Sequence, residues 1–448
     1  MPSAADHRPP RVTHLKEQAR MKLAIISDTH IGDPNCALVN LPKTGAPTVG
    51  EKYEDFKRAA GEDNDYLILL GDILDFALDS YDRVYEAGRC FFEQVHEDNI
   101  AKKIIYVAGN HDFDVWHTVE HQVNVTNRLL GAEMPRSFRW SVPGVIDVRD
   151  GRSNFRLLDV GREKDDDPQD YDPHNGDPKY GGLFMDGIVE PVGSLQFSFA
   201  YPNLYLLTDD GSVLLTHGQY FEPYWALAGE WALELMQEDL RIGDAFDLSE
   251  MVAVNFPLSQ LGSSGVGQAG PLSDAIRAVQ RQIKDGDLRR ITKYLDRLDN
   301  AIDRMTRFGW RRDKEAVTDY ISNTAKKQVL EALGDIGDTR YSDEFIHRKD
   351  VLERFVRFFD ASLLEIDRLN DKNPGLELDT PRSVLFGHTH QPIPWGAHGA
   401  PKTTTSRGPV RLYNTGGWLY RGDAQAEFGG AEVVVYRPRQ PLKSVPIR

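Results

Sequence analysis

Short apolar runs separated by polar segments organise the first part of the chain. Each run is too short for a typical helix and is bounded by polar or turn-forming residues, which predicts a buried strand. The intervening segments 51–61 and Val84–Glu97 predict helices, because apolar side chains in the second segment recur at helical spacing. Strands alternating with helices predict a layered α/β sheet. The expected strands are Lys22–Ser27, Tyr66–Leu70 and Ile104–Ala108.

The pattern becomes helical after residue 221 and stays so to about residue 370. A hairpin precedes this change, because two apolar runs flank the turn sequence Asp209-Asp210-Gly211. A large helical insertion is therefore expected to interrupt the α/β domain. The expected helices are 222–241, 272–284, 287–308, 313–333 and 343–370, and the expected strands around them are Tyr205–Thr208, Ser212–Thr216, Ser383–Phe386, Val410–Tyr413 and Glu432–Tyr436.

These patterns divide the chain into four parts. The N-terminal part is polar and contains no apolar segment of a secretory signal, so we expect a disordered leader. The α/β core is then split in two by the helical insertion. The predicted parts are the leader 1–20, the first part of the core 21–220, the helical insertion 221–380 and the last part of the core 381–448.

Metal-binding side chains directly follow five of the expected strands. Ligands gather at the carboxyl ends of strands in α/β sheets, so these side chains are expected to meet at one edge. A Gly-Asp pair alone is more often a simple turn, but the joint occurrence of all five segments predicts a polynuclear metal site. The segments are Asp28-Thr29-His30, Gly71-Asp72, Gly109-Asn110-His111-Asp112, Thr216-His217-Gly218 and Gly387-His388-Thr389-His390.

The types of ligand restrict the metal. Carboxylates mixed with imidazoles suit Mn, Fe, Zn or Co, and suit Ca poorly. No cysteine stands in the five segments, which argues against a structural zinc site. A site with two divalent metal ions is typical of enzymes that hydrolyse phosphate esters.

Charge and cysteine content narrow the possible partners. The chain of 448 residues has 53 basic and 69 acidic residues, a net charge of −16, which argues against nucleic acid as the main substrate. Two cysteines, Cys36 and Cys90, are too few for a disulfide framework. No run of apolar residues is long enough to span a membrane. We therefore expect a cytoplasmic protein.

The five segments resemble the motifs of the calcineurin-like metallophosphoesterase family. That family carries Asp-x-His, Gly-Asp, Gly-Asn-His-Asp/Glu, a lone His and Gly-His-x-His, and all five are present here over roughly residues 21–220 and 380–436. The resemblance implies a layered βαβ sandwich and two metal ions bridged by Asp72, with manganese favoured. The first ion would be held by Asp28, His30, Asp72 and His390, and the second by Asp72, Asn110, His217 and His388.

The resemblance also implies a mechanism. A hydroxide that bridges the two metals would attack phosphorus, and both metals would stabilise the developing charge. His111 is not expected to bind metal but to assist the leaving group, as a general acid or as a charge stabiliser. Asp112 is expected to orient the His111 ring; the alternative for Asp112 is a simple helix N-cap.

Departures from two branches of the family restrict the substrate. Serine/threonine phosphatases carry Asp-Arg-Gly where this chain has Asp75-Phe76-Ala77, and purple acid phosphatases carry a tyrosine at position 75. The chain looks most like bacterial UDP-2,3-diacylglucosamine hydrolases, which also carry a helical insertion, as a lid, before Gly-His-x-His. The insertion here is longer, and its aromatic first helix suits a lid or a subdomain core equally.

Two functions follow from this pattern. The first is hydrolysis of a small-molecule phosphomonoester, phosphodiester or pyrophosphate, with lipid and nucleotide esters included. The alternative is a metal-bound scaffold whose helical insertion binds a protein partner. The complete set of motif residues favours the enzyme.

Overall fold

The computed structural model describes most of the predicted α/β core and parts of the predicted insertion. The predicted leader and most of the predicted insertion, including its first four expected helices almost entirely, lie outside the described residues. The described residues are 21–42, 44–158, 182–189, 194–222, 247–262, 293, 345–421 and 427–448.

Six described strands form the first sheet, in the order β18-β17-β1-β4-β5-β8. Strands β1, β4, β5 and β8 are parallel, with β8 at one edge, and the antiparallel strands β17 and β18 extend the sheet at the other edge. Every residue of β1 and β4 is buried, as expected for strands covered on both faces. The strands are β1 (Leu23–Ile26), β4 (Tyr66–Leu70), β5 (Lys103–Val107), β8 (Gln196–Ala200), β17 (Ala431–Tyr436) and β18 (Lys443–Ile447).

The second sheet has the order β12-β14-β11-β10-β9-β6-β7 among the described residues, with β13 paired to β14. β10 and β11 are parallel neighbours, with Leu214 opposite Val384, although more than 160 residues separate them. The chain thus leaves this sheet after β10 and returns beside it. The strands are β6 (Gly144–Asp147), β7 (Asn154–Leu157), β9 (Asn203–Thr208), β10 (Gly211–Thr216), β11 (Ser383–Phe386), β12 (Pro392–Ile393), β13 (Lys402–Thr405) and β14 (Gly408–Thr415).

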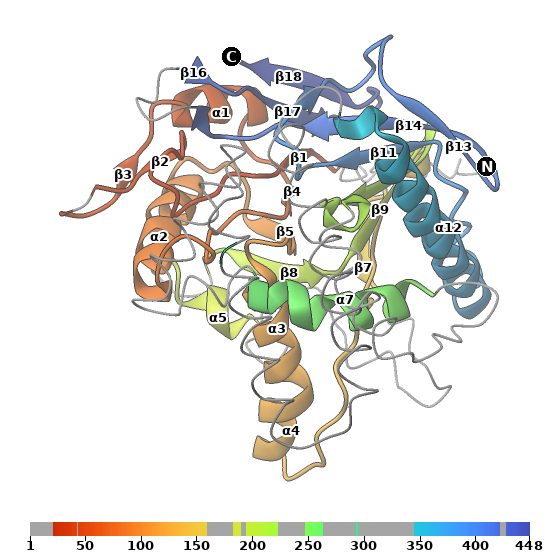
Figure 1. The fold of residues 1–448 in the computed structure, drawn as a ribbon, viewed down its shortest axis with the longest axis horizontal. Coiled ribbons are helices and arrows are strands. Elements are labelled where there is room, and N and C mark those ends of the chain that lie inside the picture. Colours follow the sequence, from red (N-terminus) through yellow and green to blue (C-terminus); the bar gives the residue numbers. More distant parts are fainter. Residues whose placement is uncertain are drawn as a thin grey trace, which may run out of the picture.

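The two sheets pack against each other and are covered by helices (Figure 1). Between the sheets, the Tyr66 ring of β4 lies 5.4 Å from the Phe155 ring of β7. Helices α1 (Tyr53–Ala60) and α2 (Tyr81–Glu97) lie on the side of the first sheet, where the Phe92 ring of α2 contacts Phe197 of β8 at 5.4 Å.

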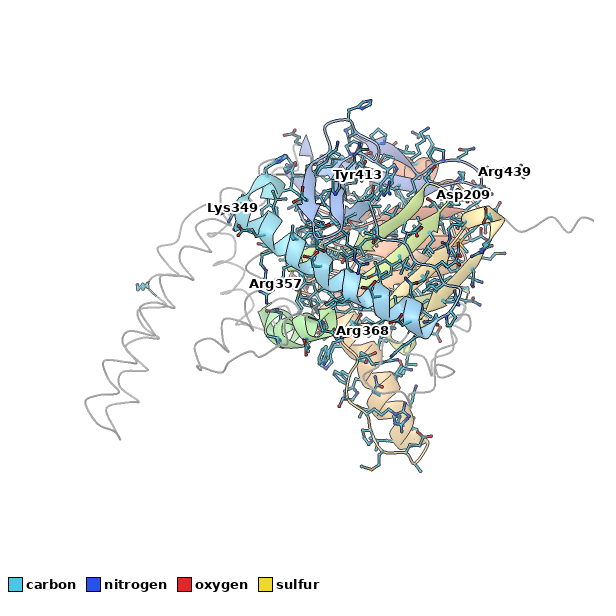
Figure 2. All side chains as sticks on the ribbon, turned by 90° about the vertical axis from the view of Figure 1, so that its right-hand side faces the viewer. Asp209, Lys349, Arg357, Arg368, Tyr413 and Arg439 are labelled. Carbon is cyan, nitrogen blue, oxygen red and sulfur yellow. The ribbon has the colours of Figure 1, made fainter. Side chains whose placement is uncertain are left out.

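Helix α12 (Lys349–Lys372) lies across the second sheet (Figure 2). Its apolar stripe, including Phe355, Phe359 and Ile366, is buried. This confirms the helix expected over 343–370, which starts as the short turn η6 (Phe345–His347).

A helical arm extends from the body beyond β8, beside α7 (Figure 1). It is formed by α3 (Phe113–His121), η1 (Gln122–Thr126) and α4 (Asn127–Leu130), which follow one another along the chain. The remaining elements are short, apart from α7. They are β2 (Val39–Asn40), β3 (Thr48–Val49), η2 (Arg149–Gly151), α5 (Leu183–Asp186), η5 (Gln219–Phe221), α7 (Leu248–Gly262), β15 (Tyr420–Arg421) and β16 (Glu427–Phe428).

The fold class agrees with the expectation from the sequence. The three strands expected first in the chain and the two helices between them are present with small shifts at their ends. Helix α7 lies in the region expected to be helical but falls between the expected helices 222–241 and 272–284. The four-part division of the chain stays a prediction. No helix among the described residues is both long and apolar enough to cross a membrane.

Candidate metal centre

The five predicted segments meet at one edge of the sandwich. Backbone hydrogen bonds join four of them in pairs, and the His111 amide of the fifth donates to the Asp72 side chain. The amide of Asp28 donates to the carbonyl of Gly71 at 3.0 Å, and the amide of Gly387 donates to the carbonyl of His217 at 2.9 Å. The loops that follow β1, β4, β10 and β11 are thereby fixed against one another, as the strand-end argument anticipates.

The backbone at this edge is strained. Asp28, His30, Asp72, His388 and His390 all have positive φ, between 46° and 68°. Residues with side chains rarely adopt this left-handed region, and such strain gathers at functional sites because the surrounding structure must enforce it. The strain turns these five side chains inward from the strand ends.

Two glycines of the motifs are required by close packing. A Cβ atom at Gly109 would collide with the Asp72 carboxylate, and one at Gly387 would collide with the Asp28 carboxylate. The glycines therefore allow the loop backbones to approach the carboxylates.

The first group of candidate ligands comprises Asp28, His30, Asp72 and His390. One potential ligand atom from each lies within 4.8 Å of those of the others. The His30 and His390 Nε2 atoms are 2.9 Å apart, and His390 Nε2 lies 3.3 Å from Asp28 Oδ1. Nitrogen and oxygen donors that converge in this way form the geometry of a cation site.

The second group comprises Asp72, His217 and His388, by the same criterion. His217 Nε2 lies 3.2 Å from Asp72 Oδ2 and 3.1 Å from Asn110 Oδ1. The other nitrogen of this ring, Nδ1, donates to the carbonyl of Leu70 at 2.8 Å, which leaves Nε2 to face the group. Asp72 belongs to both groups and is the shared carboxylate between them.

The carboxylates and imidazoles hold each other in charged forms. Burial raises the pKa of Asp72, but the His217 and His111 rings outweigh it and hold that pKa well below its usual range. Burial lowers the pKa of His217, but Asp72 outweighs this and raises it to about 9. Metal binding requires unprotonated imidazoles, so a divalent cation would replace these protons as the counter-charge.

His111 lies beside the ligand groups, and its ring is oriented by Asp75. His111 Nδ1 is 3.0 Å from Asp75 Oδ1, and the other carboxylate oxygen of Asp75 is 2.8 Å from His30 Nδ1. Asp75 is fully buried, whereas the His111 side chain is 20% exposed. One carboxylate thus orients both a candidate metal ligand and the candidate leaving-group histidine.

Asp112 has a different partner from the one expected. Its carboxylate accepts hydrogen bonds from the backbone amides of Ile73 at 2.9 Å and Gly109 at 2.6 Å, and from the Tyr106 hydroxyl at 2.5 Å. It occupies the N-cap position of α3 without a side-chain capping bond. None of these contacts supports the expectation that Asp112 orients His111, which stays a prediction. Asp112 instead ties the loop after β4 to the loop after β5.

Two residues of the centre were missed by the sequence argument. Asp75 follows Asp72 by three residues, and that spacing was used only to exclude other branches of the family. Glu222, whose Oε2 lies 2.6 Å from His388 Nε2, belongs to none of the five segments. A contact between residues 222 and 388 depends on the fold and has no local signal in the sequence.

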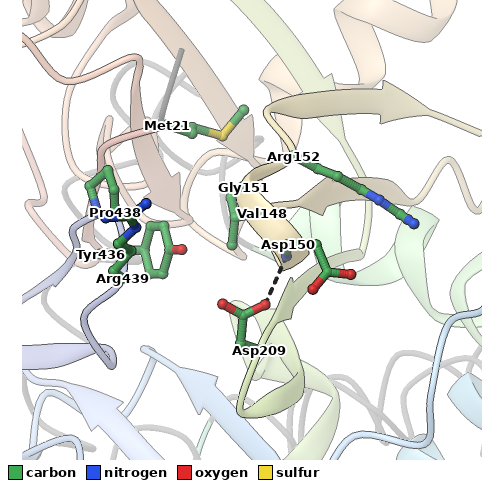
Figure 3. A pocket seen from close by; sticks show the side chains of 9 residues that line it. All are labelled: Met21, Val148, Asp150, Gly151, Arg152, Asp209, Tyr436, Pro438 and Arg439. Carbon is green, nitrogen blue, oxygen red and sulfur yellow. Dashed lines mark hydrogen bonds between the residues drawn. The ribbon is translucent and has the colours of Figure 1, made fainter. Parts of the chain in front are cut away.

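A pocket of about 220 Å³ lies elsewhere in the molecule (Figure 3). Its lining includes Met21, which precedes β1, and Tyr436, the last residue of β17. In the pocket, the Asp150 amide donates to Asp209 at 2.8 Å. It includes no residue of the two ligand groups and lies toward the amino end of β1, away from the metal-binding edge.

The donor set fits a pair of divalent metal ions. Carboxylates and imidazoles converge in three groups of possible ligands, two of which share Asp72, while the third comprises His30, Asp75 and His111. The Asn110 amide nitrogen is buried with no hydrogen-bond partner among the described residues. An amide nitrogen is a donor, so a phosphoryl oxygen is the kind of group that would satisfy it.

Comparison with known proteins agrees with this geometry. Residues 21–242 match the family model of the calcineurin-like phosphoesterases. That range includes four of the five motif segments, and β11 brings the last one, with His388 and His390, to the same edge. A search of curated proteins found no match. The chain is a metal-dependent phosphoric ester hydrolase that carries a calcineurin-like phosphoesterase domain over residues 21–242.

Proposed function

We propose that the protein hydrolyses a small-molecule phosphomonoester, phosphodiester or pyrophosphate with two metal ions that share Asp72. The observation that carries the proposal is the position of Asp72 in both ligand groups, with the His111 amide donating to Asp72 Oδ1 at 2.8 Å. The first ion would be held by Asp28, His30, Asp72 and His390, and the second by Asp72, Asn110, His217 and His388. Manganese suits this donor set, as do Fe, Zn and Co.

The two ions, when bound, would supply a nucleophile by lowering the pKa of water and would neutralise charge on the phosphoryl oxygens. The chain's own residues set the geometry. Asp72 keeps the two ligand groups adjacent, and Asn110 contributes one oxygen beside His217 at 3.1 Å. The buried Asn110 amide nitrogen can then donate to the substrate.

His111 acts on the leaving group in this proposal. Asp75 engages its Nδ1 atom, so Nε2 is the nitrogen that acts on a substrate. The Asp75 carboxylate stabilises the protonated ring, which can donate a proton to the leaving oxygen. The partial exposure of His111, against the full burial of Asp75, suits a residue that meets a substrate from solution.

The class of substrate is supported by charge as well as by the centre. A net charge of −16 opposes an extended polyanion but does not prevent a small phosphate ester from binding at a dimetal site. We therefore propose a small organic phosphate, with lipid and nucleotide esters as the first candidates. The resemblance to UDP-2,3-diacylglucosamine hydrolases and a cytoplasmic location stay predictions.

A direct assay tests this proposal. Purified protein loaded with Mn²⁺ is expected to hydrolyse bis-p-nitrophenyl phosphate or p-nitrophenyl phosphate, and chelation is expected to abolish turnover. A panel of nucleotides, phospholipids, sugar phosphates and cyclic diesters would then identify the substrate. Two bound metals without turnover in Mn, Co, Ni or Zn would instead favour the scaffold function.

A further inference from the structure

Glu222 lies at the metal centre but outside the five motif segments. Glu222 directly follows the short turn η5, which begins two residues after His217. The Glu222 amide donates to the Gln219 carbonyl at 3.2 Å. Gly218 has φ of 110°, which turns the chain back toward the centre. Both Glu222 and His388 are only 2% exposed. The contact between them is therefore shielded from water.

Aromatic packing fixes the position of this turn. The Phe221 ring lies 5.1 Å from Phe355 and 5.3 Å from Phe358, both on α12, and 5.4 Å from Phe386 of β11. The Tyr220 hydroxyl lies 2.8 Å from that of Tyr201. Because η5 packs against α12 and the end of β11, rigid elements position Glu222 beside His388.

The contact determines which nitrogen of His388 can bind a metal. Glu222 Oε2 lies 2.6 Å from His388 Nε2, a distance typical of a charge-assisted hydrogen bond. An ionised carboxylate only accepts hydrogen bonds, so Nε2 carries the proton and the lone pair is on Nδ1. His388 therefore uses the opposite tautomer to His217, whose Nδ1 donates to Leu70.

The charges of the two ligand groups give Glu222 a second role. The first group contains two carboxylates, Asp28 and Asp72, whereas the second contains only the shared Asp72 with neutral Asn110 and two imidazoles. Glu222 places a further negative charge directly behind the second group. A carboxylate behind a histidine ligand increases the basicity of the ring and strengthens its bond to the metal.

We propose that Glu222 is a positioning residue for the second metal ion, because it fixes the His388 ring and its tautomer. The backbone of His388 is fixed by Asp28, whose two carboxylate oxygens accept a hydrogen bond from the His388 amide at 2.9 Å and 3.0 Å. His388 is thus oriented at both its backbone and its ring. This inference rests on the proposed dimetal function.

The test measures metal binding rather than activity alone. Metal per chain is determined by mass spectrometry over a range of buffered free Mn²⁺, and Co²⁺ absorption reports on the ligand geometry. Glu222→Leu is expected to weaken the second metal by about 10–100-fold and leave the first unchanged. Glu222→Gln keeps an acceptor but loses the charge, so we expect a loss of roughly tenfold or less, with an altered Co²⁺ spectrum.

Two control variants bracket the result. His388→Ala should abolish the second metal and defines a complete loss. Glu365→Gln removes a buried carboxylate on α12 that hydrogen-bonds Tyr205 rather than a metal ligand, and should bind both metals as the wild type does. These controls separate an effect at His388 from a general effect of removing a buried charge.

The outcomes that overturn the inference are distinct. Wild-type affinities for both metals in Glu222→Leu would overturn it, as would an equal loss of both metals. If the leucine variant does not fold, a Glu222→Gln protein with wild-type affinity and spectrum overturns it. A wild-type protein that binds fewer than two metals would instead remove the proposed function itself.

Discussion

The metal centre and the interface beneath α12 both bury carboxylates, but the pKa values of these carboxylates are shifted in opposite directions. At the metal centre, buried Asp72 and Asp75 lie among histidines that hold the pKa of each below its usual range against the effect of burial. Beneath α12, Glu365 meets only neutral partners in its hydrogen bonds, including Tyr205 at 2.8 Å and the Ser141 hydroxyl. Burial raises its pKa to about 7.

The difference shows which buried polar groups serve the fold and which serve the chemistry. The centre combines ionised carboxylates, imidazoles and left-handed backbone, and a bound divalent cation can replace the imidazole protons as the counter-charge. Both oxygens of the Glu365 carboxylate accept hydrogen bonds within the protein, and those from Asn203 and Tyr205 join α12 to β9. Removing a group from the centre should therefore reduce activity, and removing Glu365 should change only stability.

The largest effect is expected for Asp72→Asn. Asp72 is shared by both ligand groups, so the substitution weakens both metals at once. Since metal ions supply several kcal/mol of transition-state stabilisation, turnover should fall by more than about 10³-fold. Steady-state kinetics and metal content measure this together. A variant that retains two tightly bound metals would show that Asp72 does not bridge.

His111→Gln should separate chemistry from metal binding. The His111 ring contacts Asp75 and is absent from both four-residue ligand sets, so both metals should stay bound. Turnover should fall by about 10²–10⁴-fold, the usual contribution of a general acid. Metal analysis beside kinetics on bis-p-nitrophenyl phosphate distinguishes the two effects. Loss of metal in this variant would contradict the role assigned to His111.

The sequence was sufficient to predict the positions where strands deliver ligands. Apolar runs that end in Asp, Asn or His predicted β1, β4, β5, β10 and β11 and the convergence of their loops, because parallel strand ends meet at one edge. The resemblance supplied the pairing of ligands into two sets. Neither depends on knowing the paths of the loops between the strands.

The partners behind the ligands could not be predicted in the same way. Asp75 stands three residues after Asp72, and Asp112 directly follows His111. Only the conformations of the loops decide which of the two carboxylates contacts the His111 ring. Glu222 is 166 residues from His388, and their contact follows from the pairing of β10 with β11. Local spacing contains no information about either choice.

Glu365→Gln should change stability and its dependence on pH, without changing catalysis. Burial raises the pKa of Glu365 from 4.5 to about 7, so the folded protein binds this proton more tightly than the unfolded chain. This contribution to stability is complete below about pH 4.5, is lost as the pH rises to about 7, and then stays constant. The loss corresponds to about 3 kcal/mol of the free energy of unfolding.

Glutamine keeps the shape of Glu365 but does not ionise, so the variant should lack this pH-dependent loss. Urea unfolding at pH 5 and pH 8, with a chelator present to exclude metal effects, measures the difference between the two proteins. Relative to the wild type, the variant should gain stability on going from pH 5 to pH 8. Parallel pH dependence in the two proteins would show that Glu365 is ionised in the fold despite its burial.

The smallest effect is expected for Asp75→Asn, which acts through other residues. Asp75 contacts His30 Nδ1 at 2.8 Å and His111 Nδ1 at 3.0 Å, so its loss should disturb the first metal and the leaving-group histidine together. Removing a carboxylate behind a metal-binding histidine typically costs about 10–100-fold in metal affinity. The pH profile of kcat should also shift, because the protonated form of His111 loses its neighbouring charge.

Asp79→Asn provides a matched control in the same segment of the chain. Asp79, which precedes α2, forms an ion pair at 2.9 Å with Arg83 in the first turn of that helix. Its variant should keep the wild-type metal affinity and pH profile. If Asp75→Asn and Asp79→Asn behave alike, the carboxylate that joins His30 to His111 is part of the fold only. If metal affinity and the pH profile change only in Asp75→Asn, Asp75 contributes to catalysis through its contacts with His30 and His111.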